Sequence, residues 1–294
     1  MSEERQLVAV VGAGTIGTGV AQAALEAGCG VVLIDHREEA LGAARTAVRR
    51  GLLAGRLRRP GGGGPEPGAL LERLHTTTDL ERAAGASVVI ENVVEDRAVK
   101  AGVFRRLDAA CPPGTVLAAN TSAIPIAALA ACTARPERVL GIHFMNPVAL
   151  RPAVELVRGP ATGDAAVAAV EALLARMGKR AISVGDAPGF VVNRVLMLAV
   201  NEAARVLDEG TAPAVTIDRV FTECLGHAMG PLATADLIGL DTVRDTLLVL
   251  RDALGEERFA PAPLLERLVA RGCLGRKTGR GFHAAYPPPA GSAP

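Results

Sequence analysis

The chain has 294 residues, of which 49% are hydrophobic and only 2% aromatic, and its formal net charge is +1. This length is enough for one large or two ordinary domains with a buried core. Because the 32 basic side chains are balanced in number by 31 acidic ones, and few aromatic rings can stack on bases, we expect neither a nucleic acid nor a membrane as partner.

The start of the chain and its cysteines indicate the cytoplasm. Residues 1–6 carry charges of both signs and lack the basic and then apolar layout of a secretory signal. The five cysteines are odd in number and scattered, without a CxxC pair. This pattern predicts reduced thiols rather than disulfides or a thiolate metal site. We therefore expect a cytoplasmic protein that holds no metal.

The first 35 residues follow the pattern strand, helix, strand. Residues 7–11 form a short apolar run that ends in glycine, residues 16–28 have helical spacing, and residues 30–35 form a second apolar run. Three such elements in so short a stretch are typical of the start of a parallel α/β sheet.

A long basic helix is predicted over residues 37–58. Its apolar positions recur at helical spacing, and arginines occupy its other faces. These apolar positions are Leu41, Ala44, Val48 and Leu52. The four-glycine run between Pro60 and Pro65 then predicts a loop, and a helical turn is expected over residues 68–74.

Strand and helix patterns alternate through the rest of the first half. Strands are predicted over 87–91, 116–119, 139–143, 154–157 and 181–184. Helices are predicted between them over 96–109, 125–130 and 167–177. The alternation predicts a doubly wound Rossmann-type sheet, whereas after Asp186 the pattern is helical to about residue 272. The expected fold is therefore α/β, with a Rossmann-type domain over 1–185 and an all-α domain over 186–294.

A glycine-rich turn lies between the first predicted strand and the first helix. It fits GxGxxG, and we expect its backbone to bind the pyrophosphate of a dinucleotide at the helix N-terminus. The residues concerned are Gly12, Gly14, Thr15, Ile16 and Gly17. Asp35 ends the second strand, where a carboxylate accepts hydrogen bonds from ribose hydroxyls and repels a 2′-phosphate. NAD is therefore expected rather than NADP, a preference that Arg37 weakens slightly. The alternative is a structural turn that binds no nucleotide.

A histidine and a glutamate follow at the end of the predicted sheet. His143 ends a strand at the edge where ligands bind in such folds. Glu155 comes twelve residues later, beyond the Asn146-Pro147 turn, where a returning strand can bring its carboxylate to the imidazole. A carboxylate partner fixes the tautomer of a histidine and stabilises the charge it gains as a base. The alternative is a purely structural histidine.

Several motifs in order resemble the L-3-hydroxyacyl-CoA dehydrogenases, including bacterial 3-hydroxybutyryl-CoA dehydrogenase. The resemblance runs from about residue 7 to Phe282. Besides the glycine turn and Asp35, it includes Glu91-Asn-Val-Val-Glu-Asp, Asn120-Thr-Ser122, His143-Phe-Met-Asn146-Pro147, Glu155-Leu-Val-Arg-Gly, Asp186-Ala-Pro-Gly-Phe-Val-Val-Asn193-Arg, Met229-Gly-Pro and Asp236-Leu-Ile-Gly-Leu-Asp241. It implies hydride transfer between C3 of a 3-hydroxyacyl thioester and NAD.

The resemblance also implies roles for individual residues. His143 matches the general base and Glu155 the carboxylate that orients it. Ser122 and Asn193 match the groups that hydrogen-bond the reacting oxygen of the substrate. The positions that match neighbours of the nicotinamide half of the cofactor are Glu95, Lys100, Ser122, Asn146 and Lys277. For Glu95, Lys100, Asn146 and Lys277 the alternative is an ordinary helix cap or surface charge, and for Ser122 it is a turn residue.

The basic helix departs from the family pattern. The hydroxyl and the lysine that face the phosphates of CoA in the family correspond here to Gly51 and Arg58. The segment still concentrates positive charge, which suits CoA, the acidic surface of an acyl carrier protein, or merely solvent. Its arginines are Arg45, Arg49, Arg50, Arg56, Arg58 and Arg59. Arg58 is the expected phosphate contact.

A second departure follows His143. Relatives continue Phe-Phe-Asn-Pro-Val-Pro-Val-Met-Lys, whereas this chain has Phe144-Met-Asn-Pro-Val-Ala-Leu-Arg151-Pro. Because Arg151 and Glu155 are four residues apart, an extended strand would place them on one face. Arg151 is therefore a candidate contact for a polar or carboxylated acyl group; a salt bridge or an exposed side chain is the alternative.

These observations favour an NAD-dependent dehydrogenase of short-chain 3-hydroxyacyl-CoA thioesters, such as 3-hydroxybutyryl-CoA. An alternative substrate is a glyceryl-type group on an acyl carrier protein, as in polyketide extender-unit synthesis. An alternative of another class is a non-catalytic NADH sensor. The family also implies a homodimer through the helical domain. A stripe that could serve it, or could simply be core, is Val192, Val195, Leu196, Ala199, Ala203 and Val206.

Overall fold

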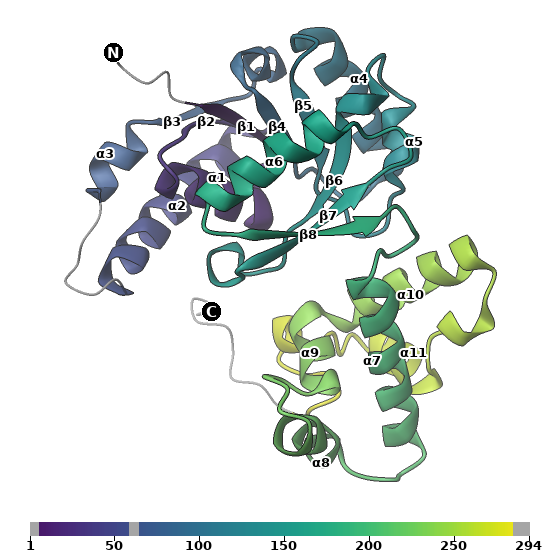
Figure 1. Cartoon of the computed structure of the whole chain (residues 1–294). Coiled ribbons are helices and arrows are strands. Elements are labelled where there is room, and N and C mark those ends of the chain that lie inside the picture. The colour runs from purple at the N-terminus through teal and green to yellow at the C-terminus, as the bar shows by residue number, and fades with distance from the viewer. Residues whose placement is uncertain (1–5, 59–64, 285–294) are drawn as a thin grey trace. The chain divides into compact units, whose positions relative to one another are not determined.

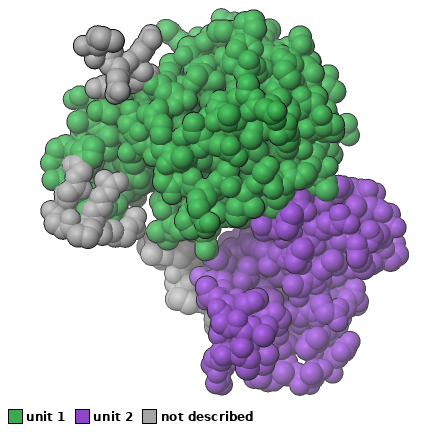
Figure 2. All heavy atoms as spheres, viewed as in Figure 1, with its two compact units in different colours: residues 1–187 green, residues 188–294 purple. Residues whose placement is uncertain are grey.

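The computed structural model describes residues 6–58 and 65–284, which form two compact units. The units are residues 1–187 and 188–294, coloured separately in Figure 2. The first is built on one eight-stranded sheet, and the described part of the second contains helices and turns but no strand (Figure 1). The predicted fold class is confirmed.

The sheet is parallel except where its sixth strand in chain order pairs with its seventh, so that the last two strands run opposite to the other six. Its strands are β1 (Leu7–Val11), β2 (Gly30–Ile34), β3 (Leu74–Thr77), β4 (Val88–Glu91), β5 (Val116–Ala119), β6 (Val139–His143), β7 (Ala153–Arg158) and β8 (Arg180–Gly185). They lie in the order β3-β2-β1-β4-β5-β6-β7-β8, and β7 runs antiparallel to β6. The carboxyl ends of β1, β2, β4, β5 and β6 therefore meet at one edge, where doubly wound folds bind ligands.

Helices cover both faces of the sheet. The helices of this unit are α1 (Thr15–Glu26), α2 (Glu38–Arg58), α3 (Pro67–Leu71), α4 (Arg97–Ala110), α5 (Ile126–Ala130) and α6 (Asp164–Arg176). Residues of α1, α2, α3 and α6 share one core with alternate strand residues such as Val88 and Ile90. Ile126 of α5 packs on Gly141, on the opposite face. The near-continuous burial of β1, β4 and β5 explains their unbroken apolar sequences.

The structure differs from the prediction between residues 67 and 77. A helical turn was expected over 68–74, but α3 ends at Leu71 and the edge strand β3 begins at Leu74. Only four residues long and half exposed, β3 lacks the apolar run that marks the other strands. It forms because its backbone pairs with β2, from Val31 to Ile34. The predicted glycine loop over 61–64 lies outside the described residues.

The second unit is a helical body with its own core. Its helices are α7 (Val192–Asp208), α8 (Ala214–Arg219), α9 (Pro231–Ile238), α10 (Leu240–Leu254) and α11 (Pro263–Ala270). Asp236 of α9 is buried and accepts hydrogen bonds from the amides of Phe282 and His283 at 2.9 and 3.0 Å. This carboxylate ties the end of the described chain to the helices. No helix in the described ranges is long and apolar enough to cross a membrane.

Candidate active site

The glycine turn after β1 brings the start of α1 close to the sheet. Gly12 has a φ of +100°, and a Cβ on it would lie 2.5 Å from the carbonyl oxygen of Asn92. A Cβ on Gly17 would lie 1.9 Å from the carbonyl oxygen of Gly12. Both positions therefore require glycine for close packing, which explains the first and third glycines of the motif.

The first turn of α1 is open to an anion. Its N-cap residue, Gly14, makes no side-chain capping hydrogen bond, and no acidic residue lies in the first turn. Gly14 and Thr15 are exposed, whereas Ile16 packs against the core. The first amides of a helix carry partial positive charge and need acceptors, which the oxygens of a pyrophosphate supply.

Asp35 joins the end of β2 to this turn. It is buried; its Oδ2 accepts a hydrogen bond from the amide of Ala13 at 2.8 Å, and its Oδ1 accepts one from the amide of Arg37 at 3.0 Å. The Nε of Arg37 lies 3.7 Å from Oδ1. A carboxylate offers about four lone pairs, so acceptor capacity remains for ribose hydroxyls.

An apolar hollow of about 250 Å³ adjoins Asp35. Aliphatic side chains that follow β3 and β4 or belong to α4 line it, together with two arginines. They include Leu80, Val93, Val94, Val99, Val103, Arg37 and Arg106. An open helix end, a carboxylate and an apolar hollow, all at one sheet edge, fit the pyrophosphate, ribose and adenine of a dinucleotide.

Two glycine substitutions in this turn should separate cofactor binding from folding. Gly14 has a φ of −72°, and a Cβ added to it would have no other atom within 4 Å, so Gly14→Ala should leave thermal unfolding unchanged. The methyl group would stand where the backbone meets the pyrophosphate, so we expect NADH affinity to fall by about 10–100-fold. Gly17→Ala should instead lower the free energy of unfolding by about 1–3 kcal/mol or more, because its Cβ meets backbone.

Titration of NADH fluorescence and thermal melts of both variants would check this pair. Equal NADH affinity of Gly14→Ala and the unaltered protein would contradict a pyrophosphate at this turn.

His143 and Glu155 form a buried pair across β6 and β7. The antiparallel register places His143 opposite Glu155, and Nδ1 lies 2.8 Å from Oε2. Both side chains are less than 10% exposed. A carboxylate accepts hydrogen bonds, so Nδ1 carries the proton and Nε2 is left as the basic nitrogen. The Oγ of Ser122 lies 3.2 Å from Nε2, so Ser122, His143 and Glu155 form a series of three hydrogen-bonded side chains.

The loop after β5 carries Ser122 and is fixed from two sides. The side-chain oxygen of Asn120 accepts a hydrogen bond from the amide of Phe144 at 3.1 Å, which links the ends of β5 and β6. Glu95, in the loop after β4, accepts a hydrogen bond from the amide of Ser122 at 2.7 Å. Sequence reasoning assigned Asn120 no role, although its place directly after a buried strand could have pointed to one.

Lys100 lies beneath these loops. Its ammonium is fully buried and donates hydrogen bonds to Glu91 at 2.9 and 3.0 Å and to the carbonyl oxygen of Asn120 at 2.9 Å. Burial raises the pKa of the Glu91 carboxyl, although the charge and hydrogen bond of Lys100 oppose the shift. The expected contact between Lys100 and the cofactor stays a prediction.

The segment after His143 is held by a buried lysine that the sequence did not single out. Lys179 donates hydrogen bonds to the carbonyl oxygens of Val148 and Arg151, at 2.5 and 2.8 Å. Burial lowers the pKa of its ammonium. Asn146 and Arg151 are both exposed, and Arg151 precedes β7, so strand register does not set its direction. The roles of both residues stay predictions.

Two expected site residues belong to the second unit. Asn193 lies in the first turn of α7, and its contact with the substrate stays a prediction. Lys277 makes an ion pair with Asp241, with its Nζ 2.6 Å from both carboxylate oxygens. This pair gives Lys277 a structural partner within its own unit, and its contact with a cofactor stays a prediction.

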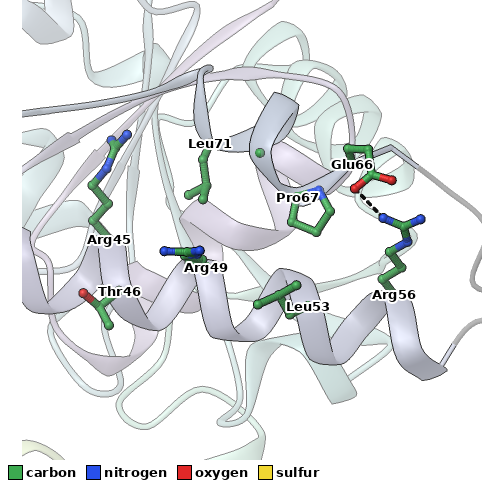
Figure 3. Close-up of a pocket in the computed structure, with 9 residues that line it drawn as sticks. Arg45, Thr46, Arg49, Leu53, Arg56, Glu66, Pro67 and Leu71 are labelled. Carbon is green, nitrogen blue, oxygen red and sulfur yellow. Dashed lines mark ion pairs between the residues drawn. The ribbon is translucent and has the colours of Figure 1, made fainter.

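The basic helix α2 presents two different faces. Three of its arginines, Arg45, Arg49 and Arg56, line a hollow of about 490 Å³ beside α3, where Arg56 pairs with Glu66 (Figure 3). Gly51 faces α1 instead, and a Cβ on it would lie 2.0 Å from the Oε1 of Gln22. Gln22 thus occupies the space that a hydroxyl at position 51 would need. The side chains of Arg58 and Arg59 lie outside the described residues.

Among the described residues, no three His, Cys, Asp or Glu side chains are grouped to hold a metal ion. The groups that this sheet edge does bring together are a dinucleotide-type turn and the Ser122-His143-Glu155 hydrogen-bonded series. A neutral imidazole paired with a carboxylate can take a proton from a hydroxyl, and a neighbouring serine can hydrogen-bond the oxygen that loses it.

Comparisons with known proteins agree with this arrangement. Residues 7–187 match the family model for the NAD-binding domain of 3-hydroxyacyl-CoA dehydrogenase, and residues 189–285 match the model for its C-terminal domain. A probable 3-hydroxybutyryl-CoA dehydrogenase of Bacillus subtilis is 44% identical over 284 residues, which cover 95% of this chain and 97% of that relative.

Solved structures give the same picture. The crystal structure of FadB2 from M. tuberculosis is 39% identical, with a TM-score of 0.90, and the match covers 96% of this chain and 99% of that one. The crystal structure of (S)-3-hydroxybutyryl-CoA dehydrogenase from Ralstonia eutropha is 38% identical, also with a TM-score of 0.90, and the match covers 97% of this chain and 100% of that one.

Proposed function

Because the chain belongs to the 3-hydroxyacyl-CoA dehydrogenase family, we propose that it interconverts short-chain 3-hydroxyacyl-CoA and 3-oxoacyl-CoA thioesters, with 3-hydroxybutyryl-CoA as the preferred substrate. It is an NAD-dependent oxidoreductase, as its resemblance to the family predicted. The single observation that carries the proposal is the Ser122-His143-Glu155 chain at the carboxyl edge of the sheet.

Ser122, His143 and Glu155 each have a defined task in this reaction. When bound, NAD supplies the hydride acceptor for C3 of the hydroxyacyl group. The Nε2 of His143 takes the proton of the substrate hydroxyl, and Glu155 stabilises the imidazolium that forms. Ser122 hydrogen-bonds the substrate oxygen as it becomes a carbonyl, and Asn193 is proposed as a second donor. In the reverse direction, His143 returns the proton.

Purified protein mixed with NAD and 3-hydroxybutyryl-CoA should produce NADH, seen as an increase in absorbance. NADP should support far slower turnover, because the Asp35 carboxylate repels a 2′-phosphate. NADH binding without turnover of any 3-hydroxyacyl thioester would contradict the proposal and favour a non-catalytic NADH sensor.

A carrier-protein thioester is the second candidate substrate, and the arginine-lined hollow of α2 is compatible with it (Figure 3). Arginines on an exposed face attract an acidic protein surface as well as the phosphates of CoA. Turnover of a glyceryl carrier-protein thioester should be compared with that of 3-hydroxybutyryl-CoA, in the unaltered protein and in Arg49→Glu. Arg271→Glu, a charge reversal at an exposed arginine of the second unit, is the matched control.

CoA and an acyl carrier protein, as the two possible carriers of the acyl group, predict different results in this comparison. A carrier-protein substrate predicts that Arg49→Glu raises its KM, whereas Arg271→Glu does not. Strong activity on the CoA ester alone, in all three proteins, would exclude the carrier-protein candidate.

We also propose a homodimer. Within the predicted stripe of α7, Ala203 is buried and Leu196 and Val206 pack against the core, but Val195 is 63% exposed. The exposed Val195 therefore leaves apolar surface on this helix for a second copy. Light scattering during gel filtration should give twice the chain mass, and Val195→Glu should reduce it.

The cytoplasm is the proposed compartment. All five cysteines are free thiols, and burial raises the pKa of Cys29 and Cys111, which keeps both protonated. Free thiols suit a reducing compartment. Fractionation of the source cells would test this placement.

A further inference from the structure

Glu95 binds the loop that carries Ser122 through one oxygen atom. Its Oε1 accepts a hydrogen bond from the hydroxyl of Thr121 at 2.6 Å, from the amide of Ser122 at 2.7 Å and from the amide of Ala123 at 3.1 Å. Hydrogen bonds to an ionised carboxylate are stronger than neutral ones. Three of them on one atom make Glu95 the main tie between the loop after β4 and the loop after β5.

The Thr121 hydroxyl extends this tie into the turn itself. It donates to Glu95 and accepts a hydrogen bond from the amide of Ile124 at 3.0 Å. The four residues from Thr121 to Ile124 are thus organised around one carboxylate oxygen and one hydroxyl. Ser122 lies inside this turn, so the position of its Cβ depends on Glu95.

The buried ammonium of Lys100 lies beside Glu95. The Nζ of Lys100 lies 3.7 Å from the Oε2 of Glu95 and bonds Glu91 and the carbonyl oxygens of Val93 and Asn120. Lys100 thus contacts both the loop after β4, which carries Glu95, and the loop after β5. Asp96, the residue directly after Glu95, caps α4 by accepting a hydrogen bond from the amide of Val99 at 2.9 Å.

We propose that Glu95 is a positioning residue of the reaction, which acts through Ser122 by holding its hydroxyl at the Nε2 of His143. The inference rests on the proposed function, because it gives Ser122 a task in the chemistry. It differs from the role that the family resemblance implies, a contact with the nicotinamide half of the cofactor. The two roles predict different kinetics, because a positioning residue changes kcat through Ser122, whereas a cofactor contact changes the affinity for NADH.

A double-mutant cycle of Glu95→Ala and Ser122→Ala separates the two roles. Residues that act as one unit show strongly non-additive effects. We expect Glu95→Ala to lower kcat by about 10–100-fold, with the Kd for NADH within about twofold of the original. In the double variant kcat should be no more than about twofold below that of Ser122→Ala alone.

Two further variants exclude a merely structural effect. Glu95→Gln keeps an oxygen that can accept from both amides and should restore kcat to within about threefold of the unaltered protein. Asp96→Ala is the matched control on the same loop. It removes the cap of α4 and should lower the melting temperature while leaving kcat unchanged. If Glu95→Ala fails to fold, Thr121→Val, which removes one of the three bonds, takes its place in the cycle.

A readout without turnover keeps this test independent of the proposed substrate. The ¹⁵N signals of the His143 ring, assigned with His143→Gln, should shift in the same direction in Glu95→Ala as in Ser122→Ala. Effects on kcat that multiply in the double variant, or an unchanged His143 signal in Glu95→Ala, would overturn the inference. Failure of the proposed function itself has a different signature, which is an unaltered protein without turnover.

Discussion

Replacing His143 by glutamine should lower kcat for 3-hydroxybutyryl-CoA by about 10²–10⁴-fold, the usual contribution of a general base. The glutamine amide has no basic nitrogen and cannot take the hydroxyl proton. Its oxygen and NH₂ group can still meet Ser122 and Glu155, so the buried site stays hydrogen-bonded. Steady-state kinetics in both directions would measure the loss.

The control for this variant is cofactor binding. The glycine turn and Asp35 follow β1 and β2, whereas His143 ends β6, so the Kd for NADH should stay within about twofold, with no more than a small change in melting temperature. A kcat within about threefold of the unaltered enzyme would exclude His143 as the base.

Replacing Glu155 by glutamine should have a similar effect for a different reason. The carboxylate only accepts hydrogen bonds and so keeps the proton on Nδ1. A glutamine can donate from its NH₂ group to Nδ1, which moves the ring proton to Nε2, the nitrogen that must act as the base. It also removes the negative charge that stabilises the imidazolium. We expect kcat to fall by about 10²–10⁴-fold.

The pair can be tested as a unit. Because Glu155 acts through His143, the double variant His143→Gln, Glu155→Gln should be about as slow as the slower single variant. ¹⁵N NMR of the His143 ring in Glu155→Gln should show the proton on Nε2. Multiplicative losses in the double variant, or a ring proton that stays on Nδ1, would refute this account of Glu155.

How far the fold was predictable depends on the range of the interactions. The turn from Gly12 to Gly17 was recognisable because strand, turn and helix are neighbours in the sequence. The edge strand β3 was missed because its four residues carry no apolar run and pair only with β2. The role of Asp35 as a ribose ligand stays a prediction, and its bond to the amide of Ala13 was not foreseen, since that bond joins two loops.

The predictability of the site also depended on the range of the interactions. His143 and Glu155 were paired in advance because a short returning strand allows few registers, and the register in β6 and β7 is one that brings them together. Lys100 was expected at the cofactor, and no local pattern shows that its ammonium is enclosed by Glu91 and two carbonyl groups. Nor does one show that Gln22 fills the space beside Gly51.

The order of amino acids alone established the class of this protein: a dinucleotide turn, a doubly wound sheet, a helical second half and a histidine at the sheet edge. These features follow from the periodicity and spacing of residues within one segment, and they do not depend on contacts with other segments. Contacts between loops required the fold, because Glu95 meets Ser122 and Lys179 meets Arg151 only when strands distant in sequence lie side by side. Those contacts position the hydroxyl and the base, so the tertiary structure decides how the predicted residues can act together.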